Sequence, residues 1–138
     1  MIRVASTTLS GVSSIQVADQ TFVAASGAAV ADLLAGPNQW RRWWPDLDLE
    51  VRENRGEKGI RWSVSGALTG TMEVWLEPSL DGVILHYFLH AEPQPALPVG
   101  KLAAAIRARR VAGKNMSFEV KSRLESGRPA GVAPAALS

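Results

Sequence analysis

Alternating hydrophobic and polar residues predict β-strands along most of this chain. Ile60, Trp62 and Val64, for example, alternate with polar residues, which is the period of a half-buried strand. The same reasoning predicts strands over residues 14–25, 47–55, 60–65, 68–77 and 82–92. The connectors between the last four strands are short and rich in turn residues, so these strands should pair as antiparallel hairpins.

Two short helices are expected between the first and second strands. Ser26 can cap a first helix over residues 27–35. Pro37 suits the first turn of a second helix, which runs to Trp44 before Pro45 disfavours helical geometry at the preceding residue.

A proline-rich crossing and a long helix complete the pattern. Residues 93–98 contain three prolines, which remove the donors that a sheet needs. Residues 99–125 contain no proline and repeat apolar or small residues at helical spacing, which predicts a helix of up to about 40 Å. Gly113 and Asn115 are poor interior residues of a helix and favour a kink or a break there.

Composition and charge indicate one domain with an uneven charge distribution. The net charge of the 138 residues is +2, but residues 1–100 carry 7 basic and 11 acidic side chains, whereas residues 101–138 carry 8 and 2. Without cysteine the chain forms no disulfide and offers no thiolate ligand. Because no signal-peptide core and no apolar run near the ~20 residues of a membrane span is seen, we expect a cytoplasmic protein. We expect one domain over residues 1–126 and a disordered tail over residues 127–138, with residues 2–9 a candidate sixth strand.

The last quarter of the chain is basic. Its charged residues are Lys101, Arg107, Arg109, Arg110, Lys114, Lys121, Arg123 and Arg128. A solvated back of the long helix is the simplest interpretation, and transient contact with an anionic membrane surface is the alternative. We expect no nucleic-acid partner, because Phe118 is the only aromatic residue among these charges and no nucleic-acid-binding motif accompanies them.

The order of these elements and two aromatic regions resemble a known superfamily. The regions are Asn38-Gln-Trp-Arg-Arg-Trp-Trp-Pro in the second helix, and Gly59-Ile-Arg-Trp-Ser-Val-Ser-Gly with Met72-Glu-Val-Trp-Leu-Glu-Pro in the strands. Over residues 15–126 the pattern resembles the START-like (SRPBCC) superfamily, in its actinobacterial polyketide cyclase/dehydrase and lipid-transport branch. The resemblance implies an α+β helix-grip fold, in which a curved antiparallel sheet wraps a long C-terminal helix and two short helices follow the first strand.

The resemblance also implies an apolar cavity between the sheet and the long helix. Its ligand would be a lipid, a fatty acyl chain or a polyketide-like molecule, bound without a cofactor. The expected ligand-binding residues are Trp43, Trp44, Trp62, Val64, Met72, Val74, Leu85, Tyr87, Leu89, Leu102, Ile106 and Val120. On this interpretation the small residues Gly113 and Ser117 leave space for the ligand. Apolar alternation alone is also compatible with a filled core, in which Trp40 and its two neighbours on the same helix face plug the end of the sheet.

No motif in the sequence assigns a reaction or a metal. The serines of Arg61-Trp-Ser-Val-Ser-Gly lack the first glycine of a nucleophile elbow. His86 and His90 lie roughly 13 Å apart along one strand, too far to chelate one metal together. Tyr87, Arg61, His86 and Asp19 are candidate acids or bases by residue type alone. We predict no catalytic and no metal-ligating residue. Two alternatives to a ligand carrier stay open: an aromatase/cyclase-type enzyme acting in the same cavity, and a regulatory interaction module with a vestigial cavity.

Overall fold

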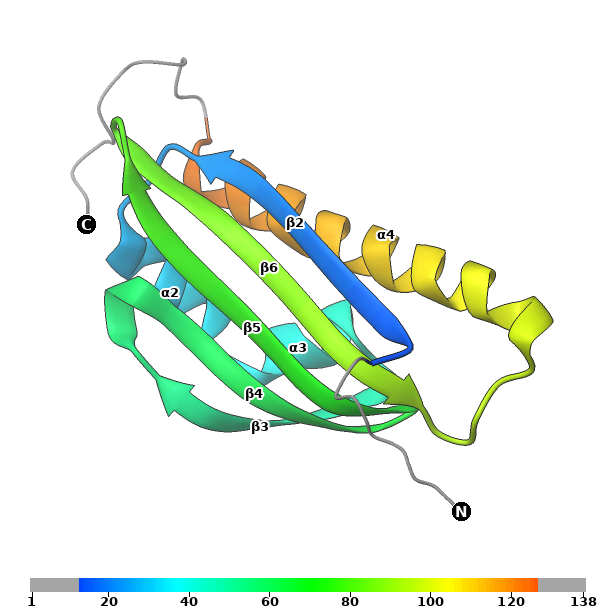
Figure 1. Cartoon of the computed structure of the whole chain (residues 1–138). Coiled ribbons are helices and arrows are strands. Elements are labelled where there is room, and N and C mark those ends of the chain that lie inside the picture. The colour runs from blue at the N-terminus through cyan, green and yellow to red at the C-terminus, as the bar shows by residue number, and fades with distance from the viewer. Residues whose placement is uncertain (1–12, 127–138) are drawn as a thin grey trace.

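The computed structural model describes residues 13–126, and in them an antiparallel sheet has its helices on one face (Figure 1). In chain order the elements are β2 (Ile15–Val23), α2 (Gly27–Leu34), α3 (Pro37–Trp43), β3 (Leu47–Asn54), the 3-10 turn η1 (Gly56–Lys58), β4 (Gly59–Gly66), β5 (Leu68–Ser79), β6 (Gly82–Pro93) and α4 (Val99–Leu124). These bounds agree with the elements expected from the sequence. The candidate sixth strand at residues 2–9 and the tail at residues 127–138 lie outside the described residues.

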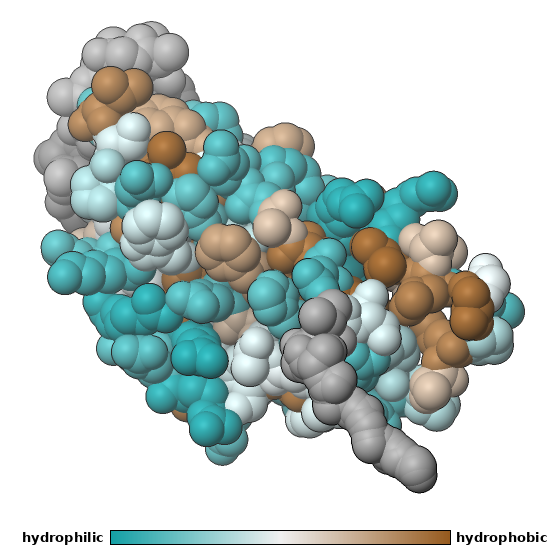
Figure 2. Space-filling view, in the orientation of Figure 1, coloured by the Kyte–Doolittle hydropathy of each residue, from teal (hydrophilic) through white to brown (hydrophobic). Residues whose placement is uncertain are grey.

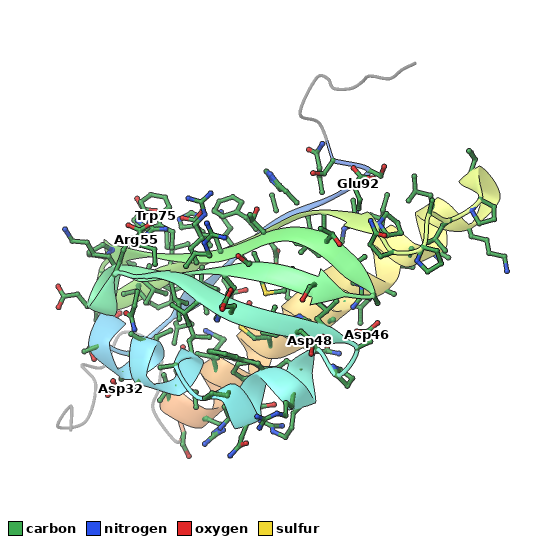
Figure 3. The ribbon with its side chains drawn as sticks, turned by 90° about the horizontal axis from the view of Figure 1, so that it is seen from below. Asp32, Asp46, Asp48, Arg55, Trp75 and Glu92 are labelled. Atoms are coloured by element: carbon green, nitrogen blue, oxygen red, sulfur yellow. The ribbon has the colours of Figure 1, made fainter. Side chains whose placement is uncertain are left out.

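The sheet has five strands in the order β2-β6-β5-β4-β3, and every neighbouring pair is antiparallel. β3 to β6 form the expected meander of hairpins. β2 pairs with β6, so α2 and α3 carry the chain from one edge of the sheet to the other. α4 packs mainly along β2, while α2 and α3 lie under the rest of the same face (Figures 1 and 3).

Local sequence features explain where these elements begin and end. The Ser26 hydroxyl accepts a hydrogen bond from the backbone N–H of Ala29 at 3.1 Å and caps α2. Pro37 occupies the first turn of α3, as expected. At the start of β4, Gly59 has a φ of 128°, and a Cβ there would lie 2.0 Å from the carbonyl oxygen of Val74. Only glycine fits this close approach of β4 to β5.

α4 is one helix of 26 residues from Val99 to Leu124, so of the kink or break expected near Gly113 and Asn115, the break does not occur. The reason is packing: a Cβ on Gly113 would lie 2.4 Å from Cε2 of Tyr87. The glycine lets the helix backbone approach the tyrosine ring closely, which offsets its poor helix propensity. No helix within residues 13–126 has the length and apolar character needed to cross a membrane.

The basic residues of α4 are only partly a solvated surface. Arg109 is bonded to Asp46 through two N–H···O contacts of 2.9 and 2.7 Å, and only 16% of its side chain is exposed. Lys114 pairs with Asp19 of β2 at 2.9 Å. Acidic residues of the sheet layer thus bind α4 directly, and the interpretation of a fully solvated helix back is wrong for these two cations.

Candidate ligand-binding site

The inner face of the sheet brings together the strand residues that the sequence assigned to ligand binding. Each is at most 3% exposed: Trp62, Val64, Met72, Val74, Leu85, Tyr87 and Leu89. They point to the helix side because they occupy alternate positions of β4, β5 and β6.

The helices complete the same interior. Val120 of α4 is fully buried, and Leu102 and Ile106 from its first half are partly buried against the core. Trp43 and Trp44 at the end of α3 are 8% and 1% exposed. All the predicted ligand-binding residues therefore lie in one apolar cluster or pack against it.

An aromatic group occupies the middle of this interior. The ring of Trp44 stacks on that of Tyr87 with 6.1 Å between centroids and 7° between planes. The ring of Trp44 also contacts that of Trp62, with 6.0 Å between centroids, and Trp62 contacts Trp40 edge-on, with 5.7 Å between centroids. Side chains therefore fill this region. The space expected beside Gly113 is taken by Tyr87, which corrects the expectation that this glycine leaves room for a ligand.

Four buried polar atoms in this interior have no hydrogen-bond partner among residues 13–126. They are Nε1 of Trp44, Nε1 of Trp62, the hydroxyl of Tyr87 and the hydroxyl of Ser117. The tryptophans at the margin differ, because Trp40 Nε1 donates to the carbonyl of Leu34 at 2.6 Å and Trp43 Nε1 donates to Glu119 at 3.1 Å. We call these four unpaired groups, Nε1 of Trp44 and Trp62 and the hydroxyls of Tyr87 and Ser117, the orphan cluster.

Tyr87 links the members of the orphan cluster. Its ring stacks on Trp44 and touches Gly113, one helical turn from Ser117 on the same face of α4. Burial raises the pKa of the Tyr87 phenol well above its ordinary value, and the nearby positive charge of Arg109 opposes this shift only weakly. The Trp44 N–H approaches the phenol oxygen and has the same weak effect on this pKa, but without hydrogen-bond geometry. The Tyr87 hydroxyl is therefore protonated at neutral pH.

Ion pairs connect α4 to α3 and to Asp46, the residue before β3, at the margin of the site. The hydrogen bond from Arg109 lowers the pKa of Asp46, and Figure 3 shows Asp46 where the start of β3 comes close to α4. Glu119 accepts from Arg42 and Trp43, and the Arg42 hydrogen bond is the largest cause of its lowered pKa. The sequence did not identify these pairings. The segregation of acidic and basic residues along the chain was a signal for them, but it names no partners.

The remaining candidate acids and bases do not reach the interior. Arg61 and His86 lie on the opposite face of the sheet, and Asp19 is held by Lys114. Tyr87 is thus the only member of that group inside the site. His90 also lies on the outer face, and within residues 13–126 no three His, Cys, Asp or Glu side chains are grouped as a metal site requires.

Comparison with known proteins identifies the fold. No family model and no curated protein matches the sequence. Among solved structures, that of the Aha1 dimer from Colwellia psychrerythraea is similar with a TM-score of 0.61 and 14% identity, over 83% of this chain and 99% of that one. The structure of the di-domain ARO/CYC protein StfQ from the steffimycin biosynthetic pathway is similar with a TM-score of 0.57 and 17% identity, over 78% of this chain and 50% of that one.

A third similar structure is the Polyketide_cyc-like protein Cgl2372 from Corynebacterium glutamicum, with a TM-score of 0.50 and 17% identity over 80% of this chain and 91% of that one. At such identities the likeness establishes the fold. The described chain has a helix-grip fold, which confirms the fold class that the sequence predicted and the resemblance as far as it concerns the fold.

Proposed function

We propose that this protein binds a hydrophobic small molecule that carries a hydrogen-bond acceptor, between the inner face of the sheet and α4. The observation that supports this function is the orphan cluster. A buried polar group without a partner costs about 1–3 kcal/mol, so four of them in one apolar interior favour occupation by something that bonds to them.

The orphan cluster also indicates which chemical group the ligand presents. Indole N–H groups only donate hydrogen bonds, so Trp44 and Trp62 require an acceptor. The hydroxyls of Tyr87 and Ser117 can donate as well. A carbonyl or carboxyl oxygen on an apolar body fits this donor set, and fatty acyl chains, other lipids and polyketide-like molecules have both parts.

Binding would require the packed side chains to move apart. Leu102 and Ile106 in the first half of α4 are only partly buried, whereas Met116 and Val120 in its second half are fully buried. We therefore place the route into the interior at the first half of α4. Apolar ligand surface removed from water there contributes roughly 25 cal/mol per Å² to binding.

The test uses two fluorescent probes that differ in their polar group. cis-Parinaric acid carries a carboxyl group, and 1,6-diphenylhexatriene carries none. We expect saturable cis-parinarate binding with energy transfer from tryptophan, and affinity at least threefold lower in Tyr87→Phe while diphenylhexatriene binding is unchanged. Ser65→Ala, on the exposed outer face, is the matched control and should bind as the wild type does. The proposal would be contradicted if cis-parinarate showed no saturable binding, or if Tyr87→Phe bound it with the same affinity as Ser65→Ala.

An aromatase/cyclase-type enzyme is the second candidate, favoured by the protonated hydroxyl of Tyr87 in the apolar interior. Such a group can donate a hydrogen bond to a ketone oxygen and stabilise the negative charge that develops there during ring closure. The fold is shared with the ARO/CYC protein StfQ. In this case Tyr87→Phe would abolish turnover of a poly-β-ketone substrate mimic without reducing its affinity, whereas for a carrier the affinity falls.

Contact with an anionic membrane would suit a lipid carrier. Lys101, Arg107 and Arg110 have no ion pair among residues 13–126, and exposed Leu97 and Val99 precede them at the start of α4. Changing the three cations to glutamine should weaken association with phosphatidylglycerol-containing vesicles at low salt and leave phosphatidylcholine vesicles unaffected. Unchanged association would exclude this contact.

A further inference from the structure

The outer face of the sheet is covered by no element of the described chain (Figure 1), and Figure 2 shows it directly, with hydrophilic side chains around smaller hydrophobic areas. Pairing of β4, β5 and β6 arranges its side chains in rows. One row consists of Arg61, Glu73 and Phe88, and the next of Ser63, Thr71 and His90.

A shallow groove crosses these rows. It consists of two hollows of ≈ 310 and ≈ 320 Å³, and both are lined by Arg61 and Thr71. The first extends to Arg52 near the β3 edge, and the second extends to Phe88 and His90 on β6. Because they share two residues, the hollows form one continuous surface from β3 to β6.

The two acidic residues of the groove, Glu53 and Glu73, share one cation. Arg55 contacts Glu73 at 2.6 Å and Glu53 at 3.6 Å. The hydrogen bond to Glu73 is the largest cause of the raised pKa of Arg55, which keeps this guanidinium charged. One cation thus serves two carboxylates, and neither carboxylate forms an ion pair with Arg61. With Arg52 and Arg61, the groove and the adjoining Arg55 carry three positive and two negative charges, a net charge of +1.

Arg61 is an exposed cation without a direct side-chain partner among the described residues. It has no ion pair and no hydrogen bond among residues 13–126, although its cross-strand neighbours are Glu53 and Glu73. Arg52 donates to the hydroxyl of Ser63 at 2.9 Å, which leaves its charge uncompensated as well. Two guanidinium groups and nearby hydroxyls are the donors that bind carboxylate and phosphate oxygens.

An ordered aromatic surface borders the groove. His86 stacks on Trp75 with 4.5 Å between ring centroids and 17° between ring planes. Phe88 continues the stack, with 6.3 Å and 2° between its ring and that of His86. His86 is fixed by a 2.9 Å contact between its Nε2 and Glu77. Phe88 is both the end of this stack and part of the groove, so a flat ring can lie against it at little cost in side-chain ordering.

We infer that this groove binds a small aromatic anion, whose carboxylate or phosphate contacts Arg61 with the hydroxyls of Ser63 and Thr71 beside it, and whose ring lies against Phe88. Two strand spacings of about 4.8 Å separate Arg61 from Phe88, so a fused ring with one anionic substituent spans the distance. This site lies on the opposite side of the sheet from the orphan cluster and does not depend on the proposed interior ligand.

Titration of the ¹⁵N-labelled protein with 2-naphthoate and with 2-naphthyl phosphate, followed by amide chemical shifts, tests the inference and separates the two anions. We expect at least one of them to shift the signals of Arg61, Thr71 and Phe88 together. Arg61→Gln should weaken that binding at least tenfold. Arg41→Gln removes another exposed arginine, on α3, and should bind as the wild type does.

Four outcomes would overturn the inference. The first is that neither anion shifts the signals of these residues, and the second is that both variants lose the same affinity for the anion. The third is equally tight binding of uncharged 2-naphthylmethanol at the same signals, and the fourth is that inorganic phosphate binds as tightly as 2-naphthyl phosphate. The third result would remove the role of the charge, and the fourth would remove the role of the ring. A shift confined to the interior residues around Tyr87 would likewise place the probe in the other site.

Discussion

The inner and outer faces of the sheet consist of alternate residues of the same strands, yet they leave different groups unpaired. On the inner face, neutral donors such as Trp62 Nε1 are buried in an apolar cluster without a partner. On the outer face, Glu73 has its partner in Arg55, and the exposed cation Arg61 has no ion pair among residues 13–126. Water solvates the exposed cation but does not reach the buried donors, so the inner face has far more to gain from a bound ligand.

The largest difference between the faces should appear when a large ring is removed from each. Trp62→Ala removes a fully buried indole and should lower the free energy of unfolding by about 3–5 kcal/mol. Trp75→Ala removes an indole that is 41% exposed and should cost less than about 1.5 kcal/mol, mostly from its stack on His86. Urea denaturation measures both values, and similar losses would show that the inner face is not the dominant core.

Close packing of α4 on the inner face gives the second prediction. Gly113→Ala places a methyl group against the Tyr87 ring and should cost about 1–3 kcal/mol, even though alanine is the better helix former by about 1 kcal/mol. In Gly100→Ala nothing lies within 4 Å of the added carbon, so that variant should be neutral or more stable. Thermal unfolding of the pair gives the comparison, and a stabilising Gly113→Ala would mean that Tyr87 can turn aside.

The phenol of Tyr87, the only tyrosine of the chain, makes folding stability at high pH a probe of the inner face. Burial raises its pKa in the folded state, so above pH ~10 the unfolded chain loses the phenolic proton first and folding stability falls as pH rises, by at most about 1.4 kcal/mol per pH unit. Tyr87→Phe should flatten this part of the stability curve. Phenolate absorbance of the folded protein appearing at the ordinary pKa would contradict the burial of the hydroxyl.

The smallest effect is expected from the outer-face ion pair. Glu73→Gln removes the carboxylate that Arg55 contacts and should cost about 0.2–1 kcal/mol, less at high salt, because both side chains are partly exposed. Glu50→Gln on the exposed surface of β3 serves as the control with no expected change. Chemical denaturation at low and high salt measures the difference, and a salt-independent loss would point to packing rather than charge.

Strand and helix boundaries followed from local patterns because each depends on neighbours a few residues away. The alternation of Ile60, Trp62 and Val64 predicted both β4 and its buried face. Pro37 and Pro45 likewise bracketed α3 correctly. Of the kink or break expected at Gly113, the break was wrong. Helix propensity is a local property, whereas this glycine packs against the ring of Tyr87, 26 residues earlier in the chain.

The sequence by itself determined the order of elements, the meander of hairpins and the set of apolar residues that meet inside, because hydrophobic periodicity and turn residues encode them directly. The tertiary structure alone decided which polar groups are left unpaired. Ser117 and Arg61 are ordinary residues in the sequence, and only the packing of α4 on the sheet buries the first without a partner. Likewise, the pairing of Arg55 with both neighbouring acids leaves the second without an ion pair among the described residues. Hydrogen bonds and ion pairs depend on distances between segments far apart in the chain, and those distances exist only in the folded molecule.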